Sequence, residues 1–185
     1  IDVLLSKSIK TKINVVVMKG INDDEILDFV ALTKTYPIEV RFIEFMPFSG
    51  NRWSSNKVLT LQEIVDHIST EYTLEPIPQK PNDTTKPFSI AGHLGSIAII
   101  STMTAPFCGS CNRIRLTADG KLKNCLFSQT ETDLLTPLRN GEDILPLIYQ
   151  NIKSKSAMLG GQLTTDFNAI ETESLSNRSM ITIGG

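Results

Sequence analysis

Residues 12–45 read KINVVVMKGINDDEILDFVALTKTYPIEVRFIEF, and the fold class follows mainly from this stretch. Residues 12–18 are a β-branched run, which is typical of a buried parallel strand. Acidic residues then lead into 23–35, where apolar side chains recur with helical spacing until Pro37. Residues 38–45 form a second strand. Strand, helix and strand with short joints make a βαβ unit, so we expect part of an α/β barrel or a doubly wound sheet.

Beyond this unit the pattern changes towards antiparallel β structure. Thr60-Leu-Gln-Glu63 is a capping box, which predicts a helix through about residue 70. Asp119-Gly120 predicts a two-residue hairpin turn between strands at 112–118 and 121–127. The other predicted elements are strands at about 72–76, 87–91 and 96–103, and helices at about 132–139 and 142–155. We expect the last of these helices to bury its apolar side chains, namely Ile144, Leu145, Leu147, Ile148 and Ile152.

The polar loop at 77–86, rich in Pro, Asn and Thr, divides the chain into two predicted regions. Residues 1–77 carry the α/β barrel part, and residues 78–185 form an α+β region with antiparallel hairpin strands. The chain starts at Ile1, and residues 1–10 read like the end of a helix that runs into a strand. We therefore expect the chain to be the C-terminal portion of a longer protein.

The charge and hydropathy of the chain argue against two classes of partner, nucleic acids and membranes. The 185 residues are 41% hydrophobic and 21% charged, with a formal net charge of −2. This charge balance offers no basic field of the kind that binds nucleic acid. No apolar run approaches membrane-spanning length. We expect no nucleic-acid or membrane partner, and a reducing compartment, either the cytoplasm or a mitochondrial matrix. Oligomeric state stays open, a homodimer included.

The three cysteines of the chain form one pattern, Cys108-Gly-Ser-Cys111 followed by Cys125. An odd count leaves no complete disulfide framework, and Cys-x-x-Cys in such a sequence indicates metal or redox chemistry. The predicted hairpin would return Cys125 towards the pair. Three thiolates are one short of a closed four-ligand site, so a shared centre either borrows a ligand or keeps an open position.

Spacing alone does not choose between metals. A structural Cys₃His zinc site could recruit His93, and an iron–sulfur cluster fits the same spacing equally well. Unmetallated thiols are the third alternative.

Besides the cysteines, two pairs of cationic side chains are candidates for anion binding. Arg113 and Arg115 lie two apart on a predicted strand beside the cysteine loop, and no carboxylate accompanies them in this stretch. Paired guanidiniums suit a phosphate-bearing ligand, although a solvated strand face is the commoner explanation. Lys12 and Arg41 are cations within otherwise apolar strands. Anion binding inside a barrel and simple snorkelling at a strand end both account for them.

Several stretches together resemble the GTP 3′,8-cyclase family, also named molybdenum cofactor biosynthesis protein A. The main one is FCGSCNRIRLTADGKLKNCLF at residues 107–127. KINVVVMKGINDDEILDFV, VRFIEFMPFSGNRW and the terminal ITIGG resemble the same family in the same order. The resemblance covers nearly the whole chain. It implies the C-terminal part of an incomplete radical S-adenosylmethionine barrel of TIM type, followed by a region that carries a second four-iron cluster.

The resemblance also implies roles for individual residues. Cys108, Cys111 and Cys125 would hold a 4Fe-4S cluster whose fourth iron is open to the guanine of GTP. The residues that grip GTP would be Lys12, Arg41, Arg113, Ile114 and Arg115. Met46 would contact S-adenosylmethionine. Gly184 and Gly185 would form a tail that reaches into the active site, where bulk would obstruct it.

The implied reaction is a radical cyclisation of GTP. A 5′-deoxyadenosyl radical made from S-adenosylmethionine takes the 3′ hydrogen, and the carbon radical adds to C8, giving 3′,8-cyclo-7,8-dihydro-GTP. The family's Cys-x-x-x-Cys-x-x-Cys motif for the radical-generating cluster does not occur in these 185 residues. We therefore expect this chain alone to be inactive. A structural zinc module and a non-catalytic nucleotide-binding remnant are the competing functions.

Overall fold

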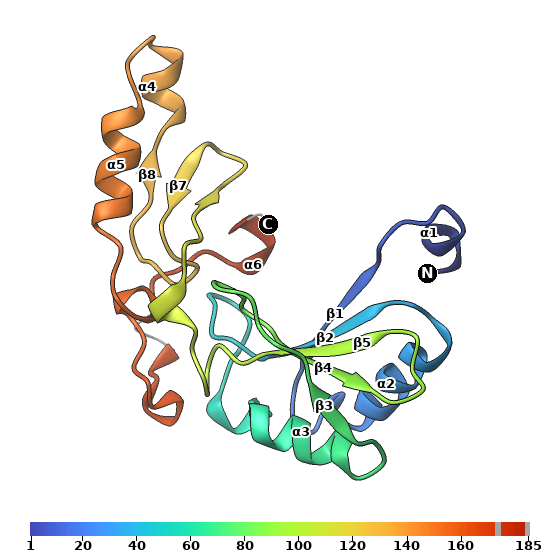
Figure 1. The fold of residues 1–185 in the computed structure, drawn as a ribbon. Helices are drawn as coiled ribbons and strands as arrows, with labels where there is room; N and C mark the ends of the chain where they lie inside the picture. Colours follow the sequence, from blue (N-terminus) through green and yellow to red (C-terminus); the bar gives the residue numbers. More distant parts are fainter. Residues whose placement is uncertain (173–174, 184–185) are drawn as a thin grey trace. The chain divides into compact units, whose positions relative to one another are not determined.

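The computed structural model describes residues 1–172 and 175–183, and it divides into two compact units (Figure 1). Unit 1 comprises residues 1–46 and 56–107, and unit 2 comprises residues 47–55 and 108–185. The expected boundary between residues 77 and 78 lies inside unit 1, because the strands on its two sides pair with each other. As a division by function, that boundary stays a prediction.

Unit 1 is a mixed sheet with two main helices. Its helices are α1 (Asp2–Ser6), α2 (Ile26–Thr35) and α3 (Leu61–Ser69), with 3-10 turns η1 (Asp23–Glu25) and η2 (Ser55–Lys57), the last of which straddles the division between the units. Its strands are β1 (Lys12–Val17), β2 (Glu39–Glu44), β3 (Leu74–Pro76), β4 (Lys86–Ile90) and β5 (Ser96–Ile100). The strand order is β1-β2-β5-β4-β3.

The βαβ unit predicted from residues 12–45 is confirmed. β1 and β2 pair in parallel, with Lys12 opposite Glu39 and Val17 opposite Glu44, and α2 joins them. β5 continues the parallel part of the sheet, whereas β4 and β3 are antiparallel. The chain is thus mixed α/β, as expected, but the strands close no barrel among the residues that the structure describes.

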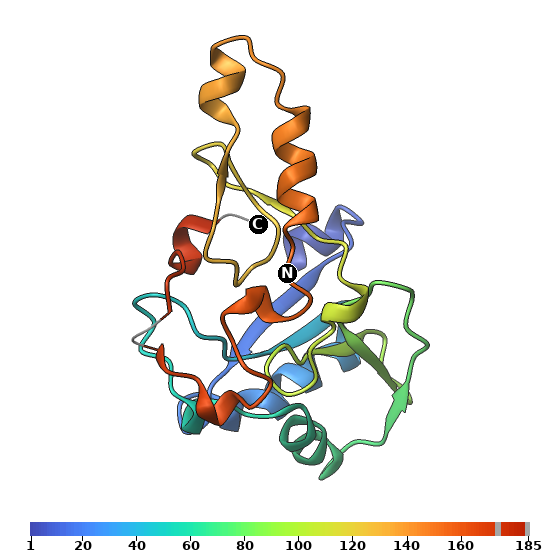
Figure 2. The same cartoon turned by 90° about the vertical axis from the view of Figure 1, so that its left-hand side faces the viewer.

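The two faces of the sheet in unit 1 differ in polarity. Val15, Val17, Val40 and Phe42 point to the buried face, where their side chains join one apolar cluster with residues of α2 and α3. Figures 1 and 2 show both helices on the same side of the sheet. The opposite face of β1 carries Lys12, Asn14 and Val16, and it is exposed, so β1 is not buried on both faces as its apolar run had suggested.

Local signals set the helix boundaries in unit 1. Thr60 caps α3 by accepting a hydrogen bond from the Glu63 N–H, and the Glu63 carboxylate accepts from the Thr60 N–H in return. The predicted capping box is therefore confirmed. Glu44 at the end of β2 is fully buried and accepts hydrogen bonds from the N–H groups of Leu61 and Met103. This carboxylate ties α3 and the segment after β5 to the end of β2.

Unit 2 has shorter strands and less regular structure. Its strands are β6 (Arg115–Leu116), β7 (Lys121–Lys123) and β8 (Thr132–Asp133), in the order β6-β7-β8 and antiparallel throughout. Its helices are α4 (Leu135–Arg139), α5 (Leu145–Lys153) and α6 (Met180–Ile183). Its 3-10 turns are η3 (Cys108–Ser110), η4 (Leu159–Gly161) and η5 (Phe167–Ala169). Figures 1 and 2 show α4 and α5 side by side.

Helix α5 differs from its prediction in what it buries. Leu145 and Ile152 are about half exposed, and the buried residue of this helix is Asn151. The Asn151 amide nitrogen donates to the Leu122 carbonyl and to the Thr132 hydroxyl. A polar side chain that satisfies strand groups therefore attaches α5 to the small sheet, and the expected apolar contact was wrong for these two residues. None of the helices in residues 1–172 and 175–183 is long and apolar enough to span a bilayer.

Candidate functional site

The cysteine loop opens unit 2 with a tight turn. Cys108–Ser110 form the 3-10 turn η3, and the Cys111 N–H donates to the Cys108 carbonyl at 3.1 Å. All three cysteines of the chain are reduced and partly exposed. None of the three is used in a disulfide.

The predicted hairpin exists, but its turn differs. Arg115 pairs with Lys123 and Leu116 with Leu122, while the Thr117 N–H donates to the Lys121 carbonyl. Three residues, Ala118 to Gly120, thus form the loop, instead of the two predicted. Gly120 has φ +75°, the left-handed conformation that such a loop requires of its last residue. The paired strands are also much shorter than the predicted 112–118 and 121–127.

Cys125 lies just beyond the paired part of the hairpin. It follows β7 by two residues, in a bend after the last paired residue, Lys123. The sulfur groups of Cys125 and Cys111 both act electrostatically on the Arg115 guanidinium. Two cysteines from different segments thus influence the same arginine. Even so, no three His, Cys, Asp or Glu side chains within 1–172 and 175–183 are grouped so that they could hold a metal ion.

A segment that the sequence reasoning missed contacts the cysteine loop. The Lys155 ammonium donates to the Cys111 sulfur at 3.4 Å and to the carbonyls of Cys111 and Arg113 at 2.9 and 3.0 Å. The Leu159 N–H donates to the Cys108 sulfur, also at 3.4 Å. These contacts join residues more than forty positions apart, so no local pattern in the sequence could have indicated them.

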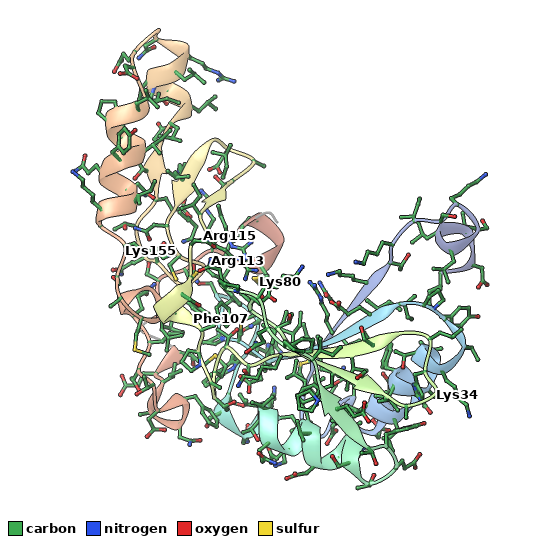
Figure 3. All side chains as sticks on the ribbon, in the orientation of Figure 1. Lys34, Lys80, Phe107, Arg113, Arg115 and Lys155 are labelled. Atoms are coloured by element: carbon green, nitrogen blue, oxygen red, sulfur yellow. The ribbon has the colours of Figure 1, made fainter. Side chains whose placement is uncertain are left out.

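The two predicted phosphate-binding arginines of unit 2 lie next to each other (Figure 3). Arg115 is on β6 and half-buried, whereas Arg113 and Ile114 precede the strand and are exposed. Burial lowers the pKa of Arg115, the charge of Arg113 lowers it further, and the sulfurs of Cys125 and Cys111 act in the opposite direction. Two cations close enough to repel each other create a field that favours an anion.

The two predicted cations of unit 1 share a carboxylate. Lys12 and Arg41 lie on the exposed face of neighbouring strands, and both form ion pairs with Glu39, the Lys12 nitrogen at 3.3 Å. Burial alone would raise the pKa of Glu39, but the hydrogen bond and charge of Arg41, with Lys12, lower it below its ordinary value. The sequence did hold a signal for this pair, because Glu39 and Arg41 are two apart on one strand.

The remaining predicted residues are Met46, His93, Gly184 and Gly185. Met46 follows β2 by two residues and is partly buried. His93, the suggested fourth ligand of a zinc site, belongs to unit 1, where its ring bonds Thr33 and stacks edge-on against Tyr72. Gly184 and Gly185 lie outside the described residues.

The donor set of the cysteine loop fits an iron–sulfur cluster in its chemistry. Such clusters are held by cysteine thiolates, and N–H donors to the sulfur atoms are one of the ways in which proteins tune them. Two of the three sulfurs here accept such a hydrogen bond. Because each thiolate of a four-iron cluster binds a different iron, its ligands need not converge on one point as those of a single ion do.

Comparison with known proteins identifies the family. Residues 38–159 match the family described as Molybdenum Cofactor Synthesis C. This chain belongs to that family. It is 44% identical to the mitochondrial GTP 3′,8-cyclase of Arabidopsis thaliana over 178 residues, which is 94% of this chain and 44% of the plant protein.

Relatives in other kingdoms show the same partial coverage. Molybdenum cofactor biosynthesis protein 1 of Mus musculus is 44% identical over 94% of this chain and 27% of its own length. The GTP 3′,8-cyclase of Syntrophomonas wolfei is 46% identical over 79% of this chain and 46% of its own length. The chain thus spans about a quarter to a half of the relatives that it matches.

Proposed function

We propose that this chain is the C-terminal, substrate-binding part of a GTP 3′,8-cyclase that acts in molybdenum cofactor biosynthesis. One observation carries the proposal: Cys111, whose sulfur accepts a hydrogen bond from Lys155, and Cys125 both act on the charge of Arg115, which neighbours Arg113, in a chain of this family. The candidate metal ligands and the candidate anion-binding residues therefore belong to the same unit, unit 2. The names of the relatives supply the reaction class.

In this proposal Cys108, Cys111 and Cys125 hold a 4Fe-4S cluster through three of its irons. The fourth iron then has no protein ligand and, when bound, the cluster supplies a Lewis-acidic site for the guanine base. The zinc module remains the competing function, although His93 is already engaged with Thr33.

Cations of both units would bind the nucleotide. Arg113 and Arg115 would donate hydrogen bonds to the phosphates beside the cysteine loop, because planar guanidiniums match phosphate oxygens in bidentate fashion, and Ile114 would belong to the same GTP-binding segment. Lys12 and Arg41 also bind the triphosphate. Glu39 holds these two cations in place before the ligand arrives, and phosphate oxygens then compete with its carboxylate.

The remaining functional assignments concern the whole protein. Unit 1 would be the C-terminal part of an incomplete radical S-adenosylmethionine barrel, with Met46 contacting S-adenosylmethionine. Gly184 and Gly185 would reach the active site. The whole enzyme converts GTP to 3′,8-cyclo-7,8-dihydro-GTP, with the bound nucleotide oriented by the residues above. Its compartment would be the cytoplasm or, as in the name of the plant relative, a mitochondrion. A homodimer stays a prediction.

Nucleotide binding by the purified chain tests this proposal. We expect the anaerobically reconstituted chain to bind GTP more tightly than ATP, because only guanine would fit the open iron. Arg115→Ala should weaken GTP binding by about 10- to 100-fold, the value of one charged hydrogen bond to phosphate. Arg139→Ala is the matched control, since Arg139 lies exposed at the end of α4. Equal binding of GTP and ATP, or equal effects of the two substitutions, would contradict the proposal.

Catalysis by the chain provides a second check. We expect no cyclised product when the chain is incubated with GTP, S-adenosylmethionine and a reductant, because the motif for the radical-generating cluster is not among its residues. Product detected by mass spectrometry would overturn this part of the proposal.

A further inference from the structure

Residues 155–162, named here the clamp segment, follow α5 and contact the cysteine site at several points. Lys155 bonds the Cys111 sulfur, and the Leu159 N–H bonds the Cys108 sulfur. Gln162 donates to the carbonyl of Phe127, two residues after Cys125. One short segment therefore reaches the surroundings of all three cysteines.

The clamp segment is shaped for this close approach. Leu159 and Gly160 both have positive φ angles, +45° and +68°, which bend the chain sharply at η4. A Cβ atom on Gly160 would lie 2.4 Å from the carbonyl carbon of Phe127, so only glycine allows the backbones to meet here. Leu159 is itself buried. The segment is therefore seated against the segment that carries Cys125.

Lys155 is the charged member of the clamp segment. Its ammonium has three acceptors within 3.4 Å: the sulfur and carbonyl of Cys111 and the carbonyl of Arg113. These contacts fix the loop between a cysteine and a predicted phosphate-binding arginine. Figure 3 shows Lys155, Arg113 and Arg115 on neighbouring segments of unit 2.

We propose that Lys155 is a positioning residue of the cysteine site, which orients Cys111 and raises the reduction potential of the cluster bound there. The inference rests on the proposed function, since it requires that the cysteines hold a cluster. Groups that hydrogen-bond to metal ligands fix their orientation, and a positive charge near a cluster stabilises its reduced, more negative form. The N–H of Leu159 acts on Cys108 in the same way without carrying a full charge.

The test compares four forms of the full chain: the unmodified chain, Lys155→Met, Lys155→Arg and Lys153→Met. Each is reconstituted anaerobically with iron and sulfide, and its iron retention against a chelator and its reduction potential are measured. Lys153→Met removes the same charge two residues away, from an exposed residue whose side chain makes no hydrogen bond or ion pair in the described part of the chain.

We expect Lys155→Met to weaken iron retention by about 10- to 100-fold, the usual effect of losing an outer partner of a metal ligand. Its reduction potential should become more negative. Lys155→Arg should keep most of both properties, and Lys153→Met should change neither. If Lys155 only held the loop carbonyls in place, its loss would alter unfolding but leave the reduction potential unchanged, so the potential distinguishes the two roles.

The inference is overturned if Lys155→Met binds a cluster with the retention and potential of the unmodified chain. In that case the proposed function still stands. If the unmodified chain assembles no cluster, the proposed function fails and this inference fails with it. Should Lys155→Met not fold, as judged by circular dichroism, Lys155→Gln removes the charge but keeps a polar amide, and its reduction potential should likewise become more negative.

Discussion

Unit 1 and unit 2 are stabilised in different ways. Unit 1 has a continuous apolar cluster between its sheet and the helices α2 and α3. Unit 2 has two- and three-residue strands, and it buries polar side chains beside apolar ones such as Leu122, Phe127 and Leu159. Lys123, Asn124 and Asn151 are almost completely buried there, and each makes hydrogen bonds to backbone carbonyls.

An ionic network adds to the polar contacts of unit 2. Arg178 donates two hydrogen bonds of 2.6 Å to Glu131 and one of 2.7 Å to Asp119 at the tip of the hairpin. Lys123 lies 3.5 Å from the same Glu131. Residues near the C-terminal end of the chain are thereby attached to the hairpin that bears Cys125.

This difference predicts which substitutions and conditions should destabilise each unit. Apolar burial has no direction, so unit 1 should depend on volume and shape. Hydrogen bonds and ion pairs need particular partners, so unit 2 should depend on single charges and on pH. A unit held together by such contacts can present cysteines and arginines on short segments. Its stability then depends on individual hydrogen bonds and ion pairs.

The largest expected effect concerns the core of unit 1. Phe42 is fully buried in the centre of β2, so Phe42→Ala should lower the free energy of unfolding of unit 1 by about 3–5 kcal/mol. Val16→Ala on the exposed face is the control and should cost less than about 0.5 kcal/mol. Urea unfolding followed by hydrogen exchange in peptides of unit 1 measures both. Similar losses of unfolding free energy for the two variants would show that the apolar cluster does not dominate the stability of unit 1.

A pair of glycines tests the close approach of the clamp segment. Gly160 and Gly141 both have positive φ, but only Gly160 faces atoms that a Cβ would overlap, those of Phe127 and Ser128. Gly160→Ala should therefore destabilise unit 2 by about 1–3 kcal/mol more than Gly141→Ala, the typical cost of overpacking. Thermal unfolding of the two variants measures this difference. Equal melting temperatures would show that the segment is not seated as described.

A buried charge tests the polar character of unit 2. Lys123 is 1% exposed and donates to the Ser128 carbonyl at 2.6 Å. Lys123→Met should cost about 1–3 kcal/mol, because buried acceptors lose their donor. Lys121→Met, at an exposed position of the same strand, should cost at most about 1 kcal/mol. Were Lys123→Met neutral or stabilising by chemical denaturation, the unit would not depend on this ammonium.

Acid should weaken unit 2 through its ionic network. The hydrogen bonds and charge of Arg178 lower the pKa values of Asp119 and Glu131 below their ordinary values of 3.8 and 4.5. Groups with lowered folded-state pKa values stabilise the fold above their unfolded values, and this contribution is lost as pH falls through the folded values. Stability measured between about pH 6 and pH 3 should therefore fall less steeply in Glu131→Gln than in the unmodified chain. Parallel curves would contradict the ionic network.

The regular part of the fold could be predicted because its signals are local. The strand, helix and strand of residues 12–45 and the capping box at Thr60 each arise from neighbouring side chains. The strand lengths in the hairpin differ from the prediction, because the apolar and polar alternation of residues 112–127 does not mark where pairing ends. Lys155 and Leu159 meet the cysteine loop only through the fold of unit 2, so their contacts leave no trace in sequence spacing.

Iron and acid-labile sulfide, counted per chain after anaerobic reconstitution, test the central assignment most directly. We expect about four irons and four sulfides per chain, with a broad visible absorption, and loss of most of both in Cys125→Ser. Cys125 is the informative position because it comes from the hairpin and not from the Cys-x-x-Cys turn. One tightly bound zinc without sulfide, or an unchanged iron content in Cys125→Ser, would contradict the assignment of these three cysteines to an iron–sulfur cluster.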